Sequence, residues 1–146
     1  MIDIFPQIYA GLKAHIDLFS ETEEGKALLE NGSISYHDAY ARSEQKFPCI
    51  TIEEKANSNS TGETDLVEKK SNLMYEINVY DNGKKRTEVC RKLAVVIDKY
   101  MAETMGFLRE FGEPFPNIAD ATVYRYISRY EGYIDNETGN ISRTNN

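Results

Sequence analysis

The sequence predicts an α+β fold in which a mainly antiparallel sheet carries an N-terminal helix and a long central helix, both packed on one face. Two stretches of the chain place apolar residues at helical spacing, and several shorter stretches alternate apolar and polar residues as strands do. Each helical stripe is apolar on one side only. A sheet face would bury both stripes, which is why the two helices are expected on the same layer.

The first helix is expected from about Ile2 to Leu18, and Pro6 is compatible with its first turn. The apolar stripe of this helix steps by three and four residues and comprises Phe5, Ile8, Tyr9, Leu12, Ile16 and Phe19. A second, short helix is expected over Glu23–Glu30, because Asn31 and Gly32 form a good C-terminal stop.

Strands are expected from there to the middle of the chain. Ser33–Tyr36 is a short candidate, and His37–Lys46 is expected to be a connection that can hold one helical turn. Phe47–Glu54 alternates as a strand does, and its proline is near the start, where a strand tolerates one. The clearest strand is Leu73–Tyr80. Its core face would carry Leu73, Tyr75, Ile77 and Val79.

A turn signal at Asp81–Gly83 precedes the second helical stripe, which predicts a helix from about Lys85 to Met105 that ends at Gly106. Phe107–Phe111 can form a strand. The stretch Gly112–Asp120 contains two prolines and is expected to be a loop.

The last strand is expected over Thr122–Ile134. Arg125 and Arg129 share one side of it with two apolar residues, while tyrosines line the other side. After Asp135 the chain is rich in Asn, Thr, Gly and Ser. We therefore expect residues 1–135 to form a single domain and residues 136–146 to be a disordered tail.

Composition narrows the class of protein. The chain has 146 residues, the size of one domain, with a net charge of −7 and a pI of about 4.9. An acidic chain is a poor general binder of polyanions, because phosphate contacts need clustered Lys and Arg. The sequence has no signal-peptide pattern and no stretch of membrane-spanning length, so a cytosolic protein is expected. Cys49 and Cys90 are then expected to be reduced thiols in the core.

The sequence contains no recognisable pattern of catalytic or metal-binding residues. It has no Gly-rich phosphate loop and no Cys-x-x-Cys pair, and its two His residues alone cannot build a His-based metal site. Cys90 could act with His15 or His37 only if folding happened to bring them together. We therefore expect no enzyme activity, no cofactor and no metal.

Three features are more informative. The polar stretch from Lys55 to Ser71 is longer than most hairpin loops, and such loops are often functional. Asn117 or Asp120 is expected to cap the turn before the last strand. That strand, around Tyr124–Tyr130, mixes Tyr with Arg, the residue types enriched in interface hot spots. Its alternative is an internal sheet face with cross-strand Arg–Glu and aromatic pairs. A platform for single-stranded nucleic acid also mixes these types, but the acidic balance argues against it.

An ordered set of short motifs resembles one protein family. The motifs are Phe47-Pro48-x-Ile50-x-Ile52-Glu53-Glu54, Tyr75-Glu76-Ile77-Asn78-Val79-Tyr80-x-Asn82, Gly106-Phe107-x-Arg109, Pro116-Asn117-x-x-Asp120-x-Thr122-x-Tyr124-Arg125 and Arg129-Tyr130-Glu131. In this order and spacing, from about Ile2 to Asp135, the chain is similar to the tail terminator (tail completion) proteins of long-tailed, siphophage-type phages and their prophage homologues. It also resembles the small head-tail connector proteins.

The resemblance implies a mostly antiparallel sheet with helices on one face, and a structural role in the virion. Terminator subunits close into a ring, expected to be a hexamer, on the last ring of the tail tube. The ring stops tube growth and offers a head-joining surface. The implied partners are other copies of the chain, the tail tube protein and the head-tail connector protein, first in the bacterial cytoplasm and then at the tail–neck junction. Neither a membrane nor direct nucleic-acid recognition is expected.

Two groups of residues are expected to carry these contacts. The candidate assembly interface comprises Tyr75, Tyr80, Arg109, Asn117, Asp120, Tyr124, Arg125, Arg129 and Tyr130. The candidate flexible loop, which would order on the tail tube, comprises Asn57, Ser60, Gly62, Asp65, Lys69 and Lys70. On this hypothesis, Ala at Arg125 and Tyr130 weakens association and leaves the monomer folded. The alternatives are a head-tail connector (neck) protein and a small regulatory nucleic-acid-binding protein.

Overall fold

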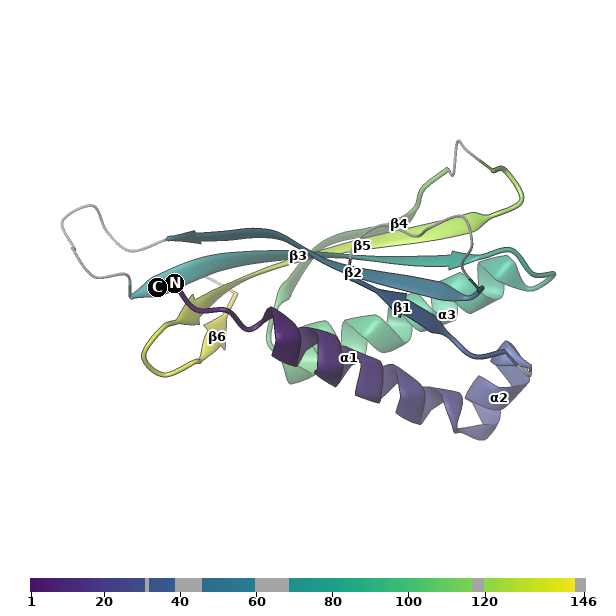
Figure 1. The fold of residues 1–146 in the computed structure, drawn as a ribbon, viewed down its shortest axis with the longest axis horizontal. Coiled ribbons are helices and arrows are strands. Elements are labelled where there is room, and N and C mark those ends of the chain that lie inside the picture. Colours follow the sequence, from purple (N-terminus) through teal and green to yellow (C-terminus); the bar gives the residue numbers. More distant parts are fainter. Residues whose placement is uncertain (31, 39–45, 60–68, 117–119, 144–146) are drawn as a thin grey trace.

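The computed structural model of the protein describes residues 1–30, 32–38, 46–59, 69–116 and 120–143. Its elements in chain order are α1 (Phe5–Ser20), α2 (Glu23–Leu29), β1 (Ser35–His37), β2 (Cys49–Asn59), β3 (Lys70–Asp81), α3 (Arg86–Asp98), the π-helical segment η1 (Lys99–Thr104), β4 (Leu108–Pro114), β5 (Tyr124–Asp135) and β6 (Ile141–Ser142) (Figure 1). The predicted α+β fold is confirmed.

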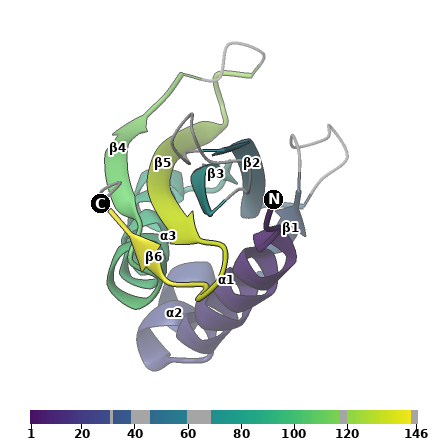
Figure 2. The same ribbon diagram turned by 90° about the vertical axis from the view of Figure 1, so that its left-hand side faces the viewer.

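The strands form one curled sheet in the order β1-β2-β3-β5-β4, and β6 pairs with the end of β5 (Figure 2). All neighbouring strands are antiparallel except β1 and β2, which are parallel. The sheet is therefore mixed rather than purely antiparallel. β3 lies at its centre and pairs along its whole length with β5.

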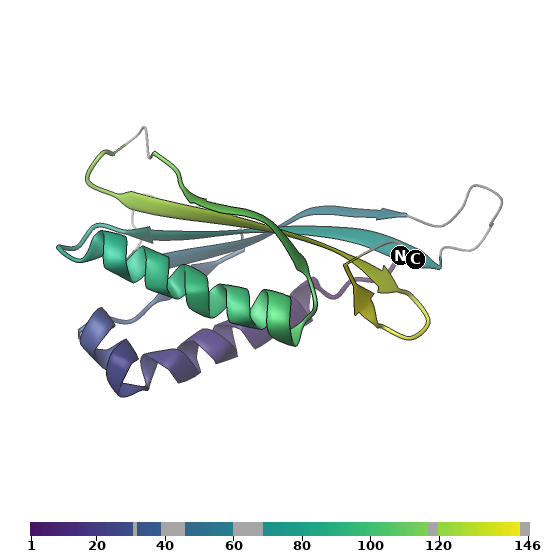
Figure 3. The same ribbon diagram turned by 180° about the vertical axis from the view of Figure 1, so that it is seen from behind.

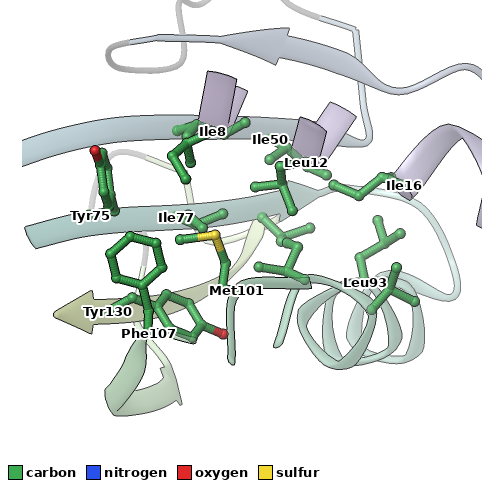
Figure 4. Packing of buried hydrophobic residues seen from close by; sticks show 14 of the residues in the cluster. Ile8, Leu12, Ile16, Ile50, Tyr75, Ile77, Leu93, Met101, Phe107 and Tyr130 are labelled. Carbon is green, nitrogen blue, oxygen red and sulfur yellow. The ribbon is translucent and has the colours of Figure 1, made fainter. Parts of the chain in front are cut away.

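Both long helices lie on the same side of the sheet (Figure 3), as the one-sided stripes predict. Ile8, Leu12 and Ile16 of α1 point toward the inner residues of β2 and β3, and Leu93 of α3 and Met101 of η1 complete the same cluster (Figure 4). These five side chains are fully buried. The face of the sheet that receives the helices is thus the wall of the hydrophobic core.

The two predicted helix ends have different outcomes. The long central helix is confirmed as α3 continued by η1, and Gly106 follows it with a φ of +86°, a backbone conformation that glycine adopts without strain. The short helix α2 begins as Thr22 Oγ1 accepts the Gly25 N–H at 3.0 Å. It ends at Leu29 and is followed by Glu30, which has a φ of 54°. Asn31, the first residue of the predicted stop, lies outside the described residues.

Two strands extend into segments that were predicted to be loops. β2 continues to Asn59, so Asn57 of the candidate flexible loop is a strand residue, because the ladder with β3 pairs Asn57 with Leu73. β4 continues to Pro114, and Gly112 pairs with β5. Cross-strand pairing overrides weak local strand preference, and an edge strand tolerates proline. The predicted connection over His37–Lys46 lies largely outside the described residues.

The prediction of a disordered tail from residue 136 is wrong for residues 136–143. The Asp135 carboxylate accepts the backbone N–H groups of Glu137 and Thr138 at 2.9 and 3.1 Å, which forms a tight turn. Ile141 then pairs with Ile134 and packs against the core. Polar composition predicted disorder, but one apolar residue in register with β5 is enough to dock this segment.

The contact between Gly132 and Phe107 gives a test of the packing. A Cβ at Gly132 would lie 2.5 Å from Cδ1 and 2.8 Å from Cε1 of the Phe107 ring, which is fully buried. We expect Gly132→Ala to lower the free energy of unfolding by about 1–3 kcal/mol, because a buried ring cannot shift without disturbing its neighbours.

Urea denaturation measures this change. Gly112→Ala is the matched strand control, because its Cβ would lie 3.3 Å from the movable hydroxyl end of Tyr126. That control should stay within about 0.5 kcal/mol of the wild type. Equal losses for the two variants would show that the close approach at Gly132 is unimportant.

Candidate assembly interface

The strand registers separate the candidate interface residues onto two faces of the sheet. β5 pairs with β3 so that Arg125 lies opposite Tyr80 and Arg129 opposite Glu76. These side chains point away from α1 and α3, while Tyr130 points into the core, as the predicted alternation requires. We call the face opposite the two helices the open face. In the described part of the chain, no helix covers it (Figure 3).

Glu76 is the centre of a charged network on the open face, although its side chain is almost fully enclosed, with 7% of the residue exposed. Arg129 Nη2 donates to Glu76 Oε1 at 2.8 Å, and Lys55 Nζ lies 3.6 Å from Glu76 Oε2. Lys55 also lies 3.1 Å from Glu53 Oε2. The carboxylate of Glu76 is therefore paired from both neighbouring strands, as a buried charge must be.

The network fixes the charge state of Glu76. Burial opposes its ionisation, but the hydrogen bond from Arg129 and the positive charge of Lys55 outweigh that cost. Together they hold the pKa of Glu76 below its ordinary value of 4.5. Glu76 is accordingly a carboxylate at neutral pH.

Arg125 lies in an aromatic sandwich beside this network. Its guanidinium is 5.5 Å from the ring centroid of Tyr80 and 5.0 Å from that of Phe115. Its Nε donates to Asn78 Oδ1 at 2.9 Å, and among the described residues its terminal Nη groups have no hydrogen-bond partner. A stacked guanidinium with free N–H groups can still bind a carboxylate from outside.

Arg129 has a different role. It is bonded to Glu76 directly across the strands, and its guanidinium lies 5.4 Å from the ring of Phe111. This is the arrangement of the alternative interpretation, an internal sheet face held by cross-strand Arg–Glu and aromatic pairs. Arg129 Nη2 is therefore engaged within the subunit, whereas its buried Nε has no hydrogen-bond partner among the described residues.

Tyr75 and Tyr130 do not belong to an interface, and that prediction is wrong. Both side chains are 0% exposed. The Tyr75 hydroxyl donates to Glu54 Oε1 at 3.1 Å, and the Tyr130 hydroxyl donates to Asp98 Oδ1 at 3.0 Å. Burial raises the pKa of both tyrosines, so both stay neutral hydrogen-bond donors. A side chain enclosed by its own subunit cannot contact a neighbour.

Tyr124 and Arg109 also lie toward the helices. Tyr124 is partly buried against the core, and its hydroxyl oxygen is buried without a hydrogen-bond partner among the described residues. Arg109 is half exposed, and its Nη1 lies 3.5 Å from Asp98 Oδ1. These two residues therefore lie apart from Arg125 and Tyr80 on the open face.

Asp120 caps the turn before β5, as predicted. Its Oδ1 accepts the Thr122 backbone N–H at 2.9 Å and the Thr122 hydroxyl at 2.6 Å. These bonds hold the pKa of Asp120 below its ordinary value. Asp120 thus has a local structural role, and Asn117 lies outside the described residues.

The candidate loop residues are divided between strands and segments outside the described residues. Asn57 is in β2, where its Nδ2 donates to the carbonyl of Ile2 at 2.7 Å and ties down the N-terminal segment. Lys70 begins β3, and the carbonyl of Lys69 accepts the Asn136 N–H at 2.7 Å. Asn57 and Lys70 are therefore strand residues rather than loop residues. Ser60, Gly62 and Asp65 lie outside the described residues.

Sequence reasoning did not identify Glu76, Phe111 and Phe115 as part of this surface. The alternation of Glu76 with Asn78 and Tyr80 was visible and shows that the three share a face. The partners of these residues depend on the register between β3 and β5 and on the pairing of β4 with β5. Neither pairing can be predicted from the local sequence.

Clusters of metal-binding side chains and reactive thiols are two arrangements that can carry out chemistry. No group of three or more His, Cys, Asp or Glu side chains among them could hold a metal ion. Cys49 and Cys90 are buried, as predicted, and burial raises the pKa of both thiols. A buried thiol of high pKa is unreactive.

Comparisons with known proteins give no family. No family model matches the chain, and no curated protein matches it either. Of the helices in the described residues, none is both long enough and apolar enough to cross a bilayer.

The charged network predicts a pH-dependent loss of stability. Glu76→Gln should lower the free energy of unfolding at neutral pH by about 1.5–3 kcal/mol, because it removes a charged hydrogen bond from an enclosed site. The pKa of Glu76 is lower in the folded state, so its contribution is complete above pH 4.5 and is lost as the pH falls below that value.

Urea titrations of the wild type and the variant, repeated from neutral to acidic pH, measure the difference between them. The difference should shrink in acid. Glu53→Gln is the control, because its more exposed pair with Lys55 should contribute at most about 1 kcal/mol. A difference that is constant with pH would rule out an ionised Glu76 as its source.

Tyr130→Ala tests the burial of that tyrosine. We expect it to lower the free energy of unfolding by about 3–5 kcal/mol, because it empties a fully enclosed aromatic site. Tyr133→Ala, at a partly buried position on the same strand, should cost less. Chemical denaturation followed by circular dichroism checks both. A variant at position 130 as stable as the wild type would restore Tyr130 as a surface candidate.

Proposed function

We propose that this protein is a structural virion assembly protein. It forms a ring at the head-proximal end of a phage tail, terminates growth of the tail tube and provides the surface that joins the head. The observation that carries the proposal is the open face, on which Arg125 is stacked between Tyr80 and Phe115 and no described residue accepts a hydrogen bond from its terminal Nη groups. The ordered motifs that resemble tail terminators support the same function.

The composition of the open face suits contact with protein. Tyr and Arg are enriched in interface hot spots, and stacking holds Arg125 in place before a partner arrives, so little side-chain entropy is lost on binding. The network around Glu76 keeps the strands beneath this surface in fixed register. The open face is therefore a rigid surface with a polar anchor.

Net charge is consistent with assembly in two stages. A charge of −7 keeps separate subunits apart and in solution. Association then needs a specific contact that overcomes this repulsion. In a ring each contact joins two different patches, and the rotation between neighbours sets the number of subunits at closure.

The first experiment is the native mass of the protein by light scattering over a range of concentrations, with and without purified tail tubes. We expect either a closed ring of about six subunits or recruitment that depends on tubes. Arg125→Ala should weaken this association by at least about tenfold, since hot-spot truncations cost about 2 kcal/mol or more.

Arg143→Ala is the matched control, because Arg143 is exposed and bonds only the Ala102 carbonyl, at 3.1 Å, among the described residues. It should associate as the wild type does. A strict monomer that ignores tail tubes would contradict the terminator function and favour a head-tail connector or an unrelated binding domain.

A further inference from the structure

A groove of about 520 Å³ lies where β4 and β5 meet the start of α3. Its lining includes Arg86, Pro114, Phe115, Pro116, Val123 and Arg125. The walls are thus mainly apolar, and two arginines are among the lining residues. The size is within the range of about 300–1,000 Å³ found for binding sites.

The groove is positively charged in an acidic protein. None of its described lining residues is Asp or Glu. Arg86 Nη1 donates to the Gly83 carbonyl at 3.2 Å. The charge of Arg86 also acts on Asp81, a largely buried carboxylate that accepts the backbone N–H groups of Asn82 and Gly83. Neither Arg86 nor Arg125 forms an ion pair with a described residue.

The groove also has an apolar contact to offer. The Phe115 side chain is one of the large apolar groups exposed among the described residues, with 44% of the residue exposed. A partner that fits must place an apolar side chain against Phe115 and a carboxylate against the two arginines. A partner with both groups is favoured over a simple anion, because an anion alone leaves the apolar wall of the groove exposed to water.

The chain itself carries this combination at the end of α1. Leu18 is 66% exposed, which among the exposed large apolar side chains of the described residues is exceeded only by Met1. Glu21 caps the same helix in a helical backbone conformation, so Leu18 and Glu21, three residues apart, lie on one face of the last turn. Glu21 is exposed and has no ion pair with a described residue. The nearby Asp17 is already bonded to the Tyr36 hydroxyl, at 2.9 Å.

We infer that the groove of one subunit receives the Leu18–Glu21 corner of a second copy of the chain. Leu18 packs on Phe115, and the carboxylate of Glu21 lies between Arg86 and Arg125. The two patches differ, so the contact is head-to-tail and repeats around a ring until it closes. This inference rests on the proposed function and names the subunit contact of its ring.

A charge exchange tests the contact. Arg86→Glu and Glu21→Arg should each weaken self-association by at least about tenfold, measured by light scattering and sedimentation. An equimolar mixture of the two variants should associate again, because every contact in an alternating ring then joins opposite charges. Arg86→Glu should fold, since an acidic residue suits the first turn of α3.

Matched controls separate this contact from general charge effects. Lys99→Glu and Glu103→Arg change the same charges at exposed positions away from the groove and should associate as the wild type does. Leu18→Ser should weaken association, whereas Val95→Ser, at another exposed apolar residue, should not. If Arg86→Glu fails to fold, Arg86→Gln tests the same side of the contact without changing the open face.

The outcomes distinguish this inference from the proposed function. Wild-type rings with unchanged association of Arg86→Glu, Glu21→Arg and Leu18→Ser would overturn the contact and leave the terminator function standing. Weak single variants whose mixture stays dissociated would also overturn the pairing. A wild type that is monomeric at every concentration and ignores tail tubes would overturn both.

Discussion

The paired position of β3 at the centre of the sheet is the constraint on which the other features depend. β3 is hydrogen-bonded to β2 on one side and β5 on the other, and its side chains alternate between two environments. The inner set, with Tyr75 and Ile77, forms the wall against which α1 and α3 pack. The outer set, with Glu76 and Asn78, is almost as deeply enclosed although no helix in the described residues covers it. Charge has to be satisfied there within the sheet itself.

The pairing of Glu76 makes the register of three strands interdependent. Its carboxylate is satisfied by Lys55 from β2 and Arg129 from β5. A one-residue slip of either neighbour would turn an apolar residue outward and leave a buried charge unpaired, which is strongly unfavourable. The network thus contributes specificity of register more than net stability. The same register places Arg125 opposite Tyr80, where its guanidinium also stacks on Phe115. The arrangement of the open face therefore depends on how β3 is paired.

The proposed assembly relates the charge of the protein to its shape. Subunits of like charge repel one another, and only a contact that combines positive charge with apolar surface can join them. The groove between β5 and the start of α3 has both properties. Its neighbour, the open face, remains for a different partner, as a ring between a tail and a head would need two kinds of surface. The two sites share Arg125, which would couple subunit contact to the outer surface.

The sequence by itself determined the class of fold, the two helices and the faces of β3 and β5, because helical and strand periodicities are local properties. It indicated that Arg125 and Arg129 share a side. Tertiary structure decided the rest, because those features depend on pairing between distant segments. Pairing with β3 extended β2 beyond its polar sequence, and docking on β5 ordered Ile141. The packing of two helices enclosed Tyr75 and Tyr130, two members of the candidate interface, although strand alternation had already assigned Tyr75 to the core face. The apolar ring and the hydroxyl of a tyrosine suit both a core and a surface, so only the tertiary structure decides in which of the two environments it lies.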